Sequence, residues 1–359
     1  MPISIPRGAV MADVVAYELS QDDKQRLLNP AIGGVILFRR NFQNIAQLKK
    51  LCSDIKSLRT PELIIAVDHE GGRVQRFIDG FTRLPAMRVL GELWDERGQT
   101  AAETAAEQVG WVLASELSAC GVDLSFTPVL DLDWGQCAVI GNRSFHRQPE
   151  IVTALALALQ RGLNRGGMKS CGKHFPGHGF VSGDSHLTLP QDERCLADLQ
   201  ADIAPFRALS NAGMAAVMPA HVVYQQVDNL PAGFSKRWLQ EILRGELGFQ
   251  GVIFSDDMTM EGAVSGGGIK QRCERAFAAG CDIVLVCNRP DLVDELCADF
   301  PSYENAHLAT RWQYMAASVS PEQATAMMNT PEFQAAQRIT AQLSTPKDVQ
   351  NGVKVGEAF

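Results

Sequence analysis

Residues that can bind ligands or transfer protons cluster in one short stretch of the chain. This stretch holds three of the seven histidines, with a lysine and an aspartate: Lys173, His174, His178, Asp184 and His186. Pro176 and the glycines at 177, 179 and 183 are incompatible with a regular helix, so residues 173–186 are predicted to form a loop. Residues 168–172 before it are predicted to form a short strand. Titratable side chains that follow a strand are typical of the catalytic face of an α/β barrel.

Two kinds of chemistry fit this stretch. A zinc site is one, since His174 and His178 are four residues apart and Asp184 and His186 could complete the ligand shell. Pro176, however, breaks the helix that would bring the first two histidines to one face. The favoured interpretation is an Asp184–His186 pair, in which the carboxylate orients the imidazole and raises its basicity. A loop held together by its own polar contacts remains a third interpretation.

Polar residues also follow other predicted strands. The segment 67–76 (VDHEGGRVQR) holds two acids and two arginines, which favours a ligand site over a capped turn. Asp131 with Asp133 is explained equally well by capping, and Arg143 could bind either a ligand or a surface carboxylate. Asp256 and Asp257 end an apolar run. Capping explains one of them, and an ionised carboxylate at this place can act as a nucleophile.

Short apolar runs and helical patterns alternate along the chain. The strands are predicted at residues 8–15, 33–38, 63–67, 122–126, 168–172, 214–218, 251–254 and 282–286. Helices are predicted between them, at residues 20–29, 44–58, 100–119, 151–165, 196–212, 236–246 and 269–279. Continuous apolar runs are typical of strands buried on both faces. Eight such repeats predict a single (β/α)8 barrel of the TIM type, in the α/β class. A doubly wound sheet is the alternative, but no GxGxxG turn follows an early strand.

Composition limits the classes of partner. The formal charge of −8 argues against nucleic acid. The nine cysteines form no CxxC pair, which favours a reducing compartment. No apolar run is long enough to cross a membrane, and the N-terminus lacks the features of a signal peptide. We therefore expect a cytoplasmic monomer without membrane contacts. Residues 1–300 are expected to form the barrel and residues 301–359 a helical extension with a mobile tail.

The motifs together resemble those of glycoside hydrolase family 3. The similar segments are Lys173–Gly179 with Asp184–His186, Gly251–Asp257, Val67–Arg76 and Gly141–Phe145. They are most similar to the single-domain bacterial β-N-acetylglucosaminidases of peptidoglycan recycling. That group usually has glutamine at position 69 and aspartate at position 142, where this chain has His69 and Asn142. The resemblance covers roughly residues 8–300.

The resemblance implies a role for each of the main polar residues. Asp256 would be the nucleophile, and His186 the general acid/base, assisted by Asp184. The N-acetylglucosamine unit would be bound by Asp68, Arg76, Arg143, Lys173 and His174. It further implies a retaining exo-hydrolase, in the cytoplasm, acting on N-acetylglucosaminyl-anhydro-N-acetylmuramic acid with or without peptide. Neither a cofactor nor a metal is expected.

Three other functions are compatible with these residues. A phosphorylase would use the same nucleophile with phosphate in place of water, which a histidine acid/base favours because it adds no negative charge beside the anion. A zinc-dependent barrel hydrolase would lose activity with a chelator. A non-catalytic barrel would bind the sugar without cleaving it.

Overall fold

Eight parallel strands form the centre of the molecule. The structure is a computed structural model that describes residues 3–182, 189–264, 266–300 and 305–344. The strands follow the order β8-β5-β3-β2-β14-β13-β11-β9, and each neighbouring pair is parallel. They are β2 (Val10–Asp13), β3 (Ile32–Leu37), β5 (Ile64–Val67), β8 (Leu124–Ser125), β9 (Cys171–Phe175), β11 (Ala216–Pro219), β13 (Val252–Asp257) and β14 (Ile283–Leu285).

The two ends of this sheet meet, so the sheet forms a nearly closed barrel. Parallel bridges pair Leu124 with Lys169 and Val129 with Lys173. The amide of Leu130 donates to the carbonyl of Lys173 at 2.6 Å. The predicted (β/α)8 barrel is therefore confirmed, because a doubly wound sheet would leave both edge strands open.

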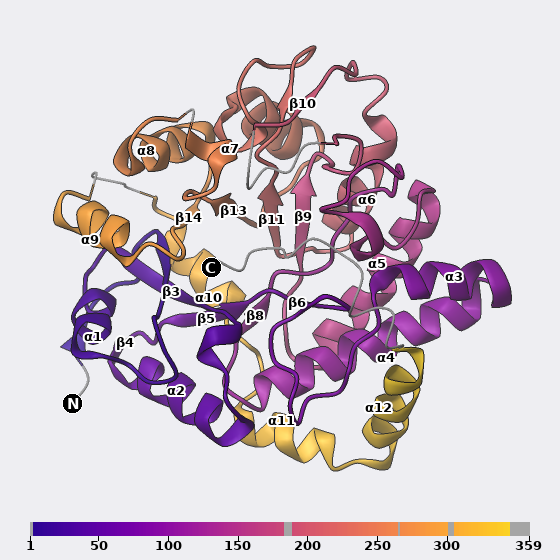
Figure 1. Cartoon of the computed structure of the whole chain (residues 1–359), viewed down its shortest axis with the longest axis horizontal. Helices are drawn as coiled ribbons and strands as arrows, with labels where there is room; N and C mark the ends of the chain where they lie inside the picture. Colours follow the sequence, from indigo (N-terminus) through magenta and orange to yellow (C-terminus); the bar gives the residue numbers. More distant parts are fainter. Residues whose placement is uncertain (1–2, 183–188, 265, 301–304, 345–359) are drawn as a thin grey trace.

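Helices surround the strands, as Figure 1 shows. They are α1 (Gln21–Leu27), α2 (Ile45–Ser57), α3 (Met87–Arg97), α4 (Gln99–Ser118), α5 (Pro149–Arg165), α6 (Gln200–Asn211), the π-helix η4 (Arg237–Glu246), α7 (Glu261–Val264), α8 (Ile269–Ala279), α9 (Pro290–Ala298), α10 (Leu308–Met315), α11 (Pro321–Met328) and α12 (Pro331–Leu343). The predicted helix starts have a physical cause, since the side chains of Ser20 and Asn44 accept from backbone amides of the first turns of α1 and α2. Helix α3 was not predicted.

Short strand pairs and 3-10 turns lie outside the eight-stranded sheet. The hairpin β6 (His69–Gly71) and β7 (Val74–Gln75) follows β5. Two further pairs are β1 (Ile3–Ser4) with β4 (Arg59–Thr60), and β10 (Gln191–Asp192) with β12 (Val223–Tyr224). The 3-10 turns are η1 (Arg39–Asn41), η2 (Gly141–Arg143) and η3 (Ala232–Phe234). The hairpin, η1 and η2 follow the carboxyl ends of strands, so they lie where a barrel carries its functional loops.

The barrel interior is filled, and helix α10 covers one end of it. Phe126 and Phe254 meet edge to face inside the barrel, with ring centroids 5.2 Å apart. Trp312 of α10 is fully buried, and its centroid lies 6.1 Å from that of Phe254. The indole NH of Trp312 donates to the carbonyl of Gly8 at 2.8 Å, just before β2 begins. A Cβ at Gly33 would approach this indole to 2.6 Å, so the close packing of α10 requires a glycine there. The amino-terminal end of the barrel is therefore closed.

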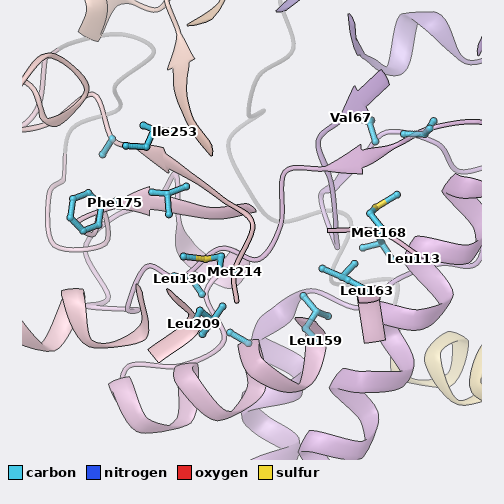
Figure 2. Close-up of a cluster of buried hydrophobic side chains, with 14 of the residues drawn as sticks. Val67, Leu113, Leu130, Leu159, Leu163, Met168, Phe175, Leu209, Met214 and Ile253 are labelled. Atoms are coloured by element: carbon cyan, nitrogen blue, oxygen red, sulfur yellow. The ribbon is translucent and has the colours of Figure 1, made fainter. Parts of the chain in front are cut away.

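A second core lies between the strands and the outer helices. Figure 2 shows Leu113 of α4 and Leu163 of α5 beside Met168, and Val67 of β5 and Leu159 of α5 belong to the same cluster. Helices α11 and α12 cover the outer side of α4, where the rings of Trp111 and Phe333 meet edge to face at 5.2 Å. The carboxyl-terminal helices are thus packed on the barrel helices.

Candidate active site

The polar residues predicted from the strand ends meet at the carboxyl-terminal face of the barrel. Asp68 directly follows β5, Lys173 and His174 lie in β9, and Asp256 lies at the end of β13. Arg143 is the last residue of η2, in the connection that follows β8. Because all the barrel strands are parallel, their carboxyl ends reach the same rim. One expectation was wrong: Lys173, His174 and Phe175 lie in the strand and not in the loop. Their side chains are therefore fixed by the sheet.

Glu70 connects the basic residues of this site. Its carboxylate accepts two hydrogen bonds from Arg143, both of 2.8 Å, and lies 2.5 Å from the Lys173 ammonium. Lys173 also donates to Asp68 at 2.7 Å. Glu70, Arg143 and Lys173 are nearly inaccessible, whereas the Asp68 side chain is 22% exposed. Two cations and two carboxylates thus form one network, of which Asp68 faces the solvent.

The charges in this network stabilise each other. Burial opposes ionisation of Glu70, but Arg143 and Lys173 outweigh it and hold the pKa of Glu70 well below its usual range. Burial would likewise lower the pKa values of Lys173 and Arg143, and the neighbouring carboxylates raise both instead. The site therefore presents a charged lysine and arginine in fixed positions, which suits the binding of sugar hydroxyls.

Asp131 forms hydrogen bonds to two histidines, His174 in β9 and His178 after that strand. Its Oδ1 accepts from the backbone amides of His174 and His178 at 3.2 and 2.7 Å, and its Oδ2 lies 2.7 Å from Nδ1 of His174. Burial raises the pKa of Asp131, but the nearby histidines lower it by a larger amount. The pKa therefore lies below its usual value, and the carboxylate is ionised. An ionised carboxylate requires a proton on Nδ1 of His174, which directs Nε2 away from Asp131.

His178 has a different environment. Burial and the neighbouring His174 lower the pKa of its imidazole to about 4, and its Nδ1 lies 3.5 Å from the thiol of Cys137. His178 is therefore neutral at physiological pH. The carbonyl of Gly177, just before it, accepts from the Tyr224 hydroxyl at 2.8 Å, and a Cβ at Gly177 would lie 2.7 Å from Cβ of Asp202. The base of the predicted loop is thus tightly packed.

Asp256 and Asp257 have distinct surroundings although they are adjacent. The amide of Asp257 donates to Oδ1 of Asp256 at 2.8 Å. The Asp257 carboxyl accepts from the amides of Thr259 and Cys287 and contacts the Thr259 hydroxyl at 2.8 Å. Burial raises the pKa of Asp257 to about 7. Asp257 is thereby largely protonated below neutral pH, and it adds little negative charge beside Asp256.

His69 belongs to an aromatic cluster. Its ring centroid lies 5.7 and 5.8 Å from those of Phe77 and Phe81. Burial lowers the pKa of His69 to about 3, so the ring is neutral. Its backbone amide and carbonyl both bond to the hydroxyl of Ser125. His69 therefore contributes packing beneath the β6–β7 hairpin that carries Glu70.

The structure brings together most of the residues predicted for the site. Asp68, Arg143, Lys173 and His174 occupy one connected region, and Arg76 lies buried directly after β7. Asp184 and His186 lie outside the described residues. Glu70 was within the recognised segment 67–76 but was not assigned a role. The sequence explains Asp131 equally well by capping, because its contacts to two histidines form only when distant segments of the chain pair.

A metal-binding cluster and a membrane-spanning helix are both absent from the described part of the chain. Within it, no group of three or more histidine, cysteine, aspartate or glutamate side chains is arranged to hold a metal ion. In the same residues, none of the helices has the length and apolarity needed to span a membrane.

Comparison with known proteins identifies the family. The model of the glycosyl hydrolase family 3 N-terminal domain matches residues 8–305. A β-hexosaminidase of Neisseria meningitidis serogroup A is 71% identical over 356 residues, which cover 99% of each chain. Crystal structures of NagZ from Neisseria gonorrhoeae cover 96% of this chain and all of theirs: one in complex with N-trifluoroacetyl-D-glucosamine (69% identity, TM-score 0.93), another with zinc ion (68%, 0.91). The chain therefore belongs to glycosyl hydrolase family 3 and is a glycoside hydrolase of the β-hexosaminidase class.

Proposed function

We propose that this enzyme is a retaining exo-β-N-acetylglucosaminidase that removes terminal N-acetylglucosamine from peptidoglycan fragments ending in anhydro-N-acetylmuramic acid. The main support is the arrangement at the barrel mouth, where the Asp256 carboxylate shares one rim with the Asp68–Lys173–Glu70–Arg143 network. The gonococcal relative that binds N-trifluoroacetyl-D-glucosamine is consistent with an acetamido sugar in this place. The proposed setting is the cytoplasm, with the enzyme as a monomer.

The proposed reaction has two steps. In the first, the Asp256 carboxylate attacks the anomeric carbon, the bond from this carbon to the aglycone oxygen breaks, and His186 gives its proton to that oxygen. In the second, a water molecule gives a proton to His186, its oxygen bonds to the anomeric carbon, and Asp256 leaves as a carboxylate. Two inversions preserve the β configuration. Asp184 orients His186 throughout.

The surroundings of Asp256 support its role. A nucleophile must be ionised when the substrate is bound. The protonated form of Asp257 removes a neighbouring negative charge that would otherwise oppose this ionisation, and its amide hydrogen bond orients the Asp256 carboxylate.

The network around Lys173 supports sugar binding. Asp68, Arg76, Arg143, Lys173 and His174 would contact the hydroxyls and the acetamido group. Glu70 and Asp131 would act through them, since Glu70 holds the two cations in place and Asp131 orients the His174 ring. Preorganised donors of this kind avoid the cost of reorganisation when the substrate binds.

The first experiment measures nitrophenol release from the β-N-acetylglucosaminide and from the β-glucoside. We expect strong preference for the acetamido sugar and, by NMR, a β-anomer as the first product. Asp256→Ala should lower kcat by at least about a thousandfold, since it removes the nucleophile. Release that survives this substitution, or an α-anomer as the first product, would refute the assignment.

Two additions separate the alternatives. A chelator tests the zinc-dependent hydrolase, which one observation favours, namely the zinc ion bound by a gonococcal relative. Inorganic phosphate tests the phosphorylase, which would release a sugar 1-phosphate. The proposed hydrolase is unaffected by chelator and releases free N-acetylglucosamine in both conditions.

The role of His186 requires substrates with different leaving groups. His186→Ala should strongly slow cleavage of the natural disaccharide, whose leaving alcohol needs a proton, and affect an activated aryl glycoside much less. Equal losses on both substrates would contradict a role as general acid.

A further inference from the structure

A second concave site borders the barrel mouth. It is a cavity of about 370 Å³, and its lining includes Tyr17, Phe38, Arg39, Arg40, Phe42 and Asp79. This volume is within the range of small-molecule sites. Phe38 directly follows β3, so the cavity lies at the same carboxyl-terminal face as the catalytic residues. None of these residues has a role in the reaction described above.

The walls of the cavity are held in place by the side-chain amides of Asn41 and Gln47. The side chain of Asn41, which is fully buried, donates to the carbonyls of Val14 and Ala16 and accepts from the amide of Phe38. Gln47 donates to the carbonyls of Tyr17 and Asn41 at 2.7 and 3.1 Å. These bonds join the segment after β2 to the segment after β3. The cavity is therefore preorganised.

The two arginines of the cavity differ in their contacts. Arg40 pairs with Asp13 and donates to Oδ1 of Asn288 at 2.8 Å, so its charge is already compensated. Arg39 is exposed, and across the described ranges its guanidinium has no hydrogen-bond or ion-pair partner. A guanidinium without a partner in a preorganised, partly aromatic cavity suits a carboxylate ligand.

The order of strands places this cavity on the aglycone side. β5, β8 and β9 are neighbours around the barrel, and they or their connections carry Asp68, Arg143 and Lys173. The other arc runs from β13 through β14 and β2 to β3, with Asp256 at β13 and the cavity after β3. If the first group binds the sugar hydroxyls, Asp256 attacks from the face of the anomeric carbon opposite the leaving group. The leaving group then projects away from β13, toward the side of the rim on which β3 and the cavity lie.

A chain of contacts spans that arc. The amide of Asp257 donates a hydrogen bond to the Asp256 carboxylate, and the Asp257 carboxyl accepts one from the amide of Cys287. The next residue, Asn288, donates its amide to Asp13 and accepts from Arg40. The cavity and the nucleophile are thus parts of one hydrogen-bonded rim.

We propose that this cavity is a subsite for the aglycone, in which Arg39 binds a carboxylate of the leaving group while Tyr17 and Phe42 contact its apolar parts. This inference rests on the proposed function, which supplies an aglycone with a lactyl or peptide carboxylate. Asp79, the acid in the lining, weakens the attraction and so limits affinity for the released product.

The test uses two disaccharides that differ in one charge: N-acetylglucosaminyl-anhydro-N-acetylmuramic acid and its lactyl methyl ester. The wild-type enzyme should have a kcat/KM about fivefold higher for the acid, mainly through KM, as expected for a partly exposed ion pair. Arg39→Ala should remove this preference, and Asp79→Asn should increase it. Cleavage of the uncharged nitrophenyl glycoside measures catalysis without the carboxylate contact, and the Arg39 variant should retain it.

Arg97→Ala is the matched control, because Arg97 is an exposed arginine at the end of α3. It should leave the preference for the acid unchanged. Equal kcat/KM values for acid and ester in the wild type, or a preference that survives Arg39→Ala, would overturn the subsite. Cleavage of the nitrophenyl glycoside without cleavage of either disaccharide would instead refute the proposed natural substrate.

Discussion

Glu70 is a buried acid that holds together two basic residues of the candidate site. It is the ion-pair partner of the buried Arg143 and, with Asp68, one of two partners of Lys173, and its own ionisation depends on both cations. Removing one partner of a buried ion pair costs more than the pair itself contributes, because a charge is left without a partner.

We therefore expect Glu70→Gln to destabilise the fold and to weaken substrate binding. The free energy of unfolding should fall by about 3–5 kcal/mol, as is typical for a broken buried pair. The KM for the acetamido glycoside should also rise, since Arg143 and Lys173 lose their fixed positions. Urea unfolding and steady-state kinetics measure the two effects. Glu96→Gln, at an exposed position, is the control. Unchanged stability of the Glu70 variant would contradict the role given to this network.

Asp257 gives a prediction about pH. Its pKa is about 7 in the folded protein against an ordinary value of 3.8. Between these values the folded protein keeps a proton that the unfolded chain releases, so this group makes stability fall as pH rises from about 4 to 7. Above the folded pKa its contribution no longer changes.

Asp257→Asn tests this directly. The amide can accept from the amides of Thr259 and Cys287 and can donate to the Thr259 hydroxyl, as the protonated acid does. We expect the variant to lose this part of the pH dependence, so that its stability relative to the wild type increases from pH 4 to 7. Guanidinium unfolding at several pH values measures it. A constant difference between the two proteins would show that Asp257 is ionised throughout.

At the scale of elements, α10 closes the barrel through a single large side chain. Trp312 fills the space beneath Phe254 and contacts the glycines of β3. Trp312→Ala should lower the free energy of unfolding by about 3–5 kcal/mol, because a large buried cavity remains. The kcat of the folded enzyme should stay near that of the wild type, since the catalytic residues lie at the other end.

Tyr314→Ala is the control for this prediction, because Tyr314 is on the same helix and is 47% exposed. Thermal unfolding and kinetics report the two quantities. A loss of kcat with unchanged stability would mean that α10 acts on the site and not on the core.

For the whole molecule, we expect the folding unit to extend beyond the residues that the family model matches. The family model ends at residue 305, but α10, α11 and α12 cover the barrel end and the outer side of α4. A chain cut after Phe300 is therefore expected to aggregate or to be digested rapidly by protease. A chain that ends at Ser344 retains all of these helices and serves as the control. A stable, active product from the shorter chain would refute this expectation.

Much of the barrel could be predicted because its strands are continuous apolar runs. All eight predicted strands are present, and strand ends such as Asp68 and Asp256 indicated the site directly. The role of Glu70 could not be predicted, because it depends on Arg143 and Lys173, which are distant in sequence. Helix α3 was missed, since its N-cap residue Ala86 supplies no side-chain hydrogen bond and gives no start signal. The π-helical hydrogen bonding of residues 237–246 likewise has no sequence signature that we could use.

The closed barrel end has a kinetic consequence. Since Trp312 and the rings above it fill the interior, a bound sugar must depart by the route through which it arrived. In the proposed reaction the aglycone lies outermost, so it must diffuse away before the sugar can. Product release is then ordered, and free N-acetylglucosamine, the last product to leave, should compete with the substrate.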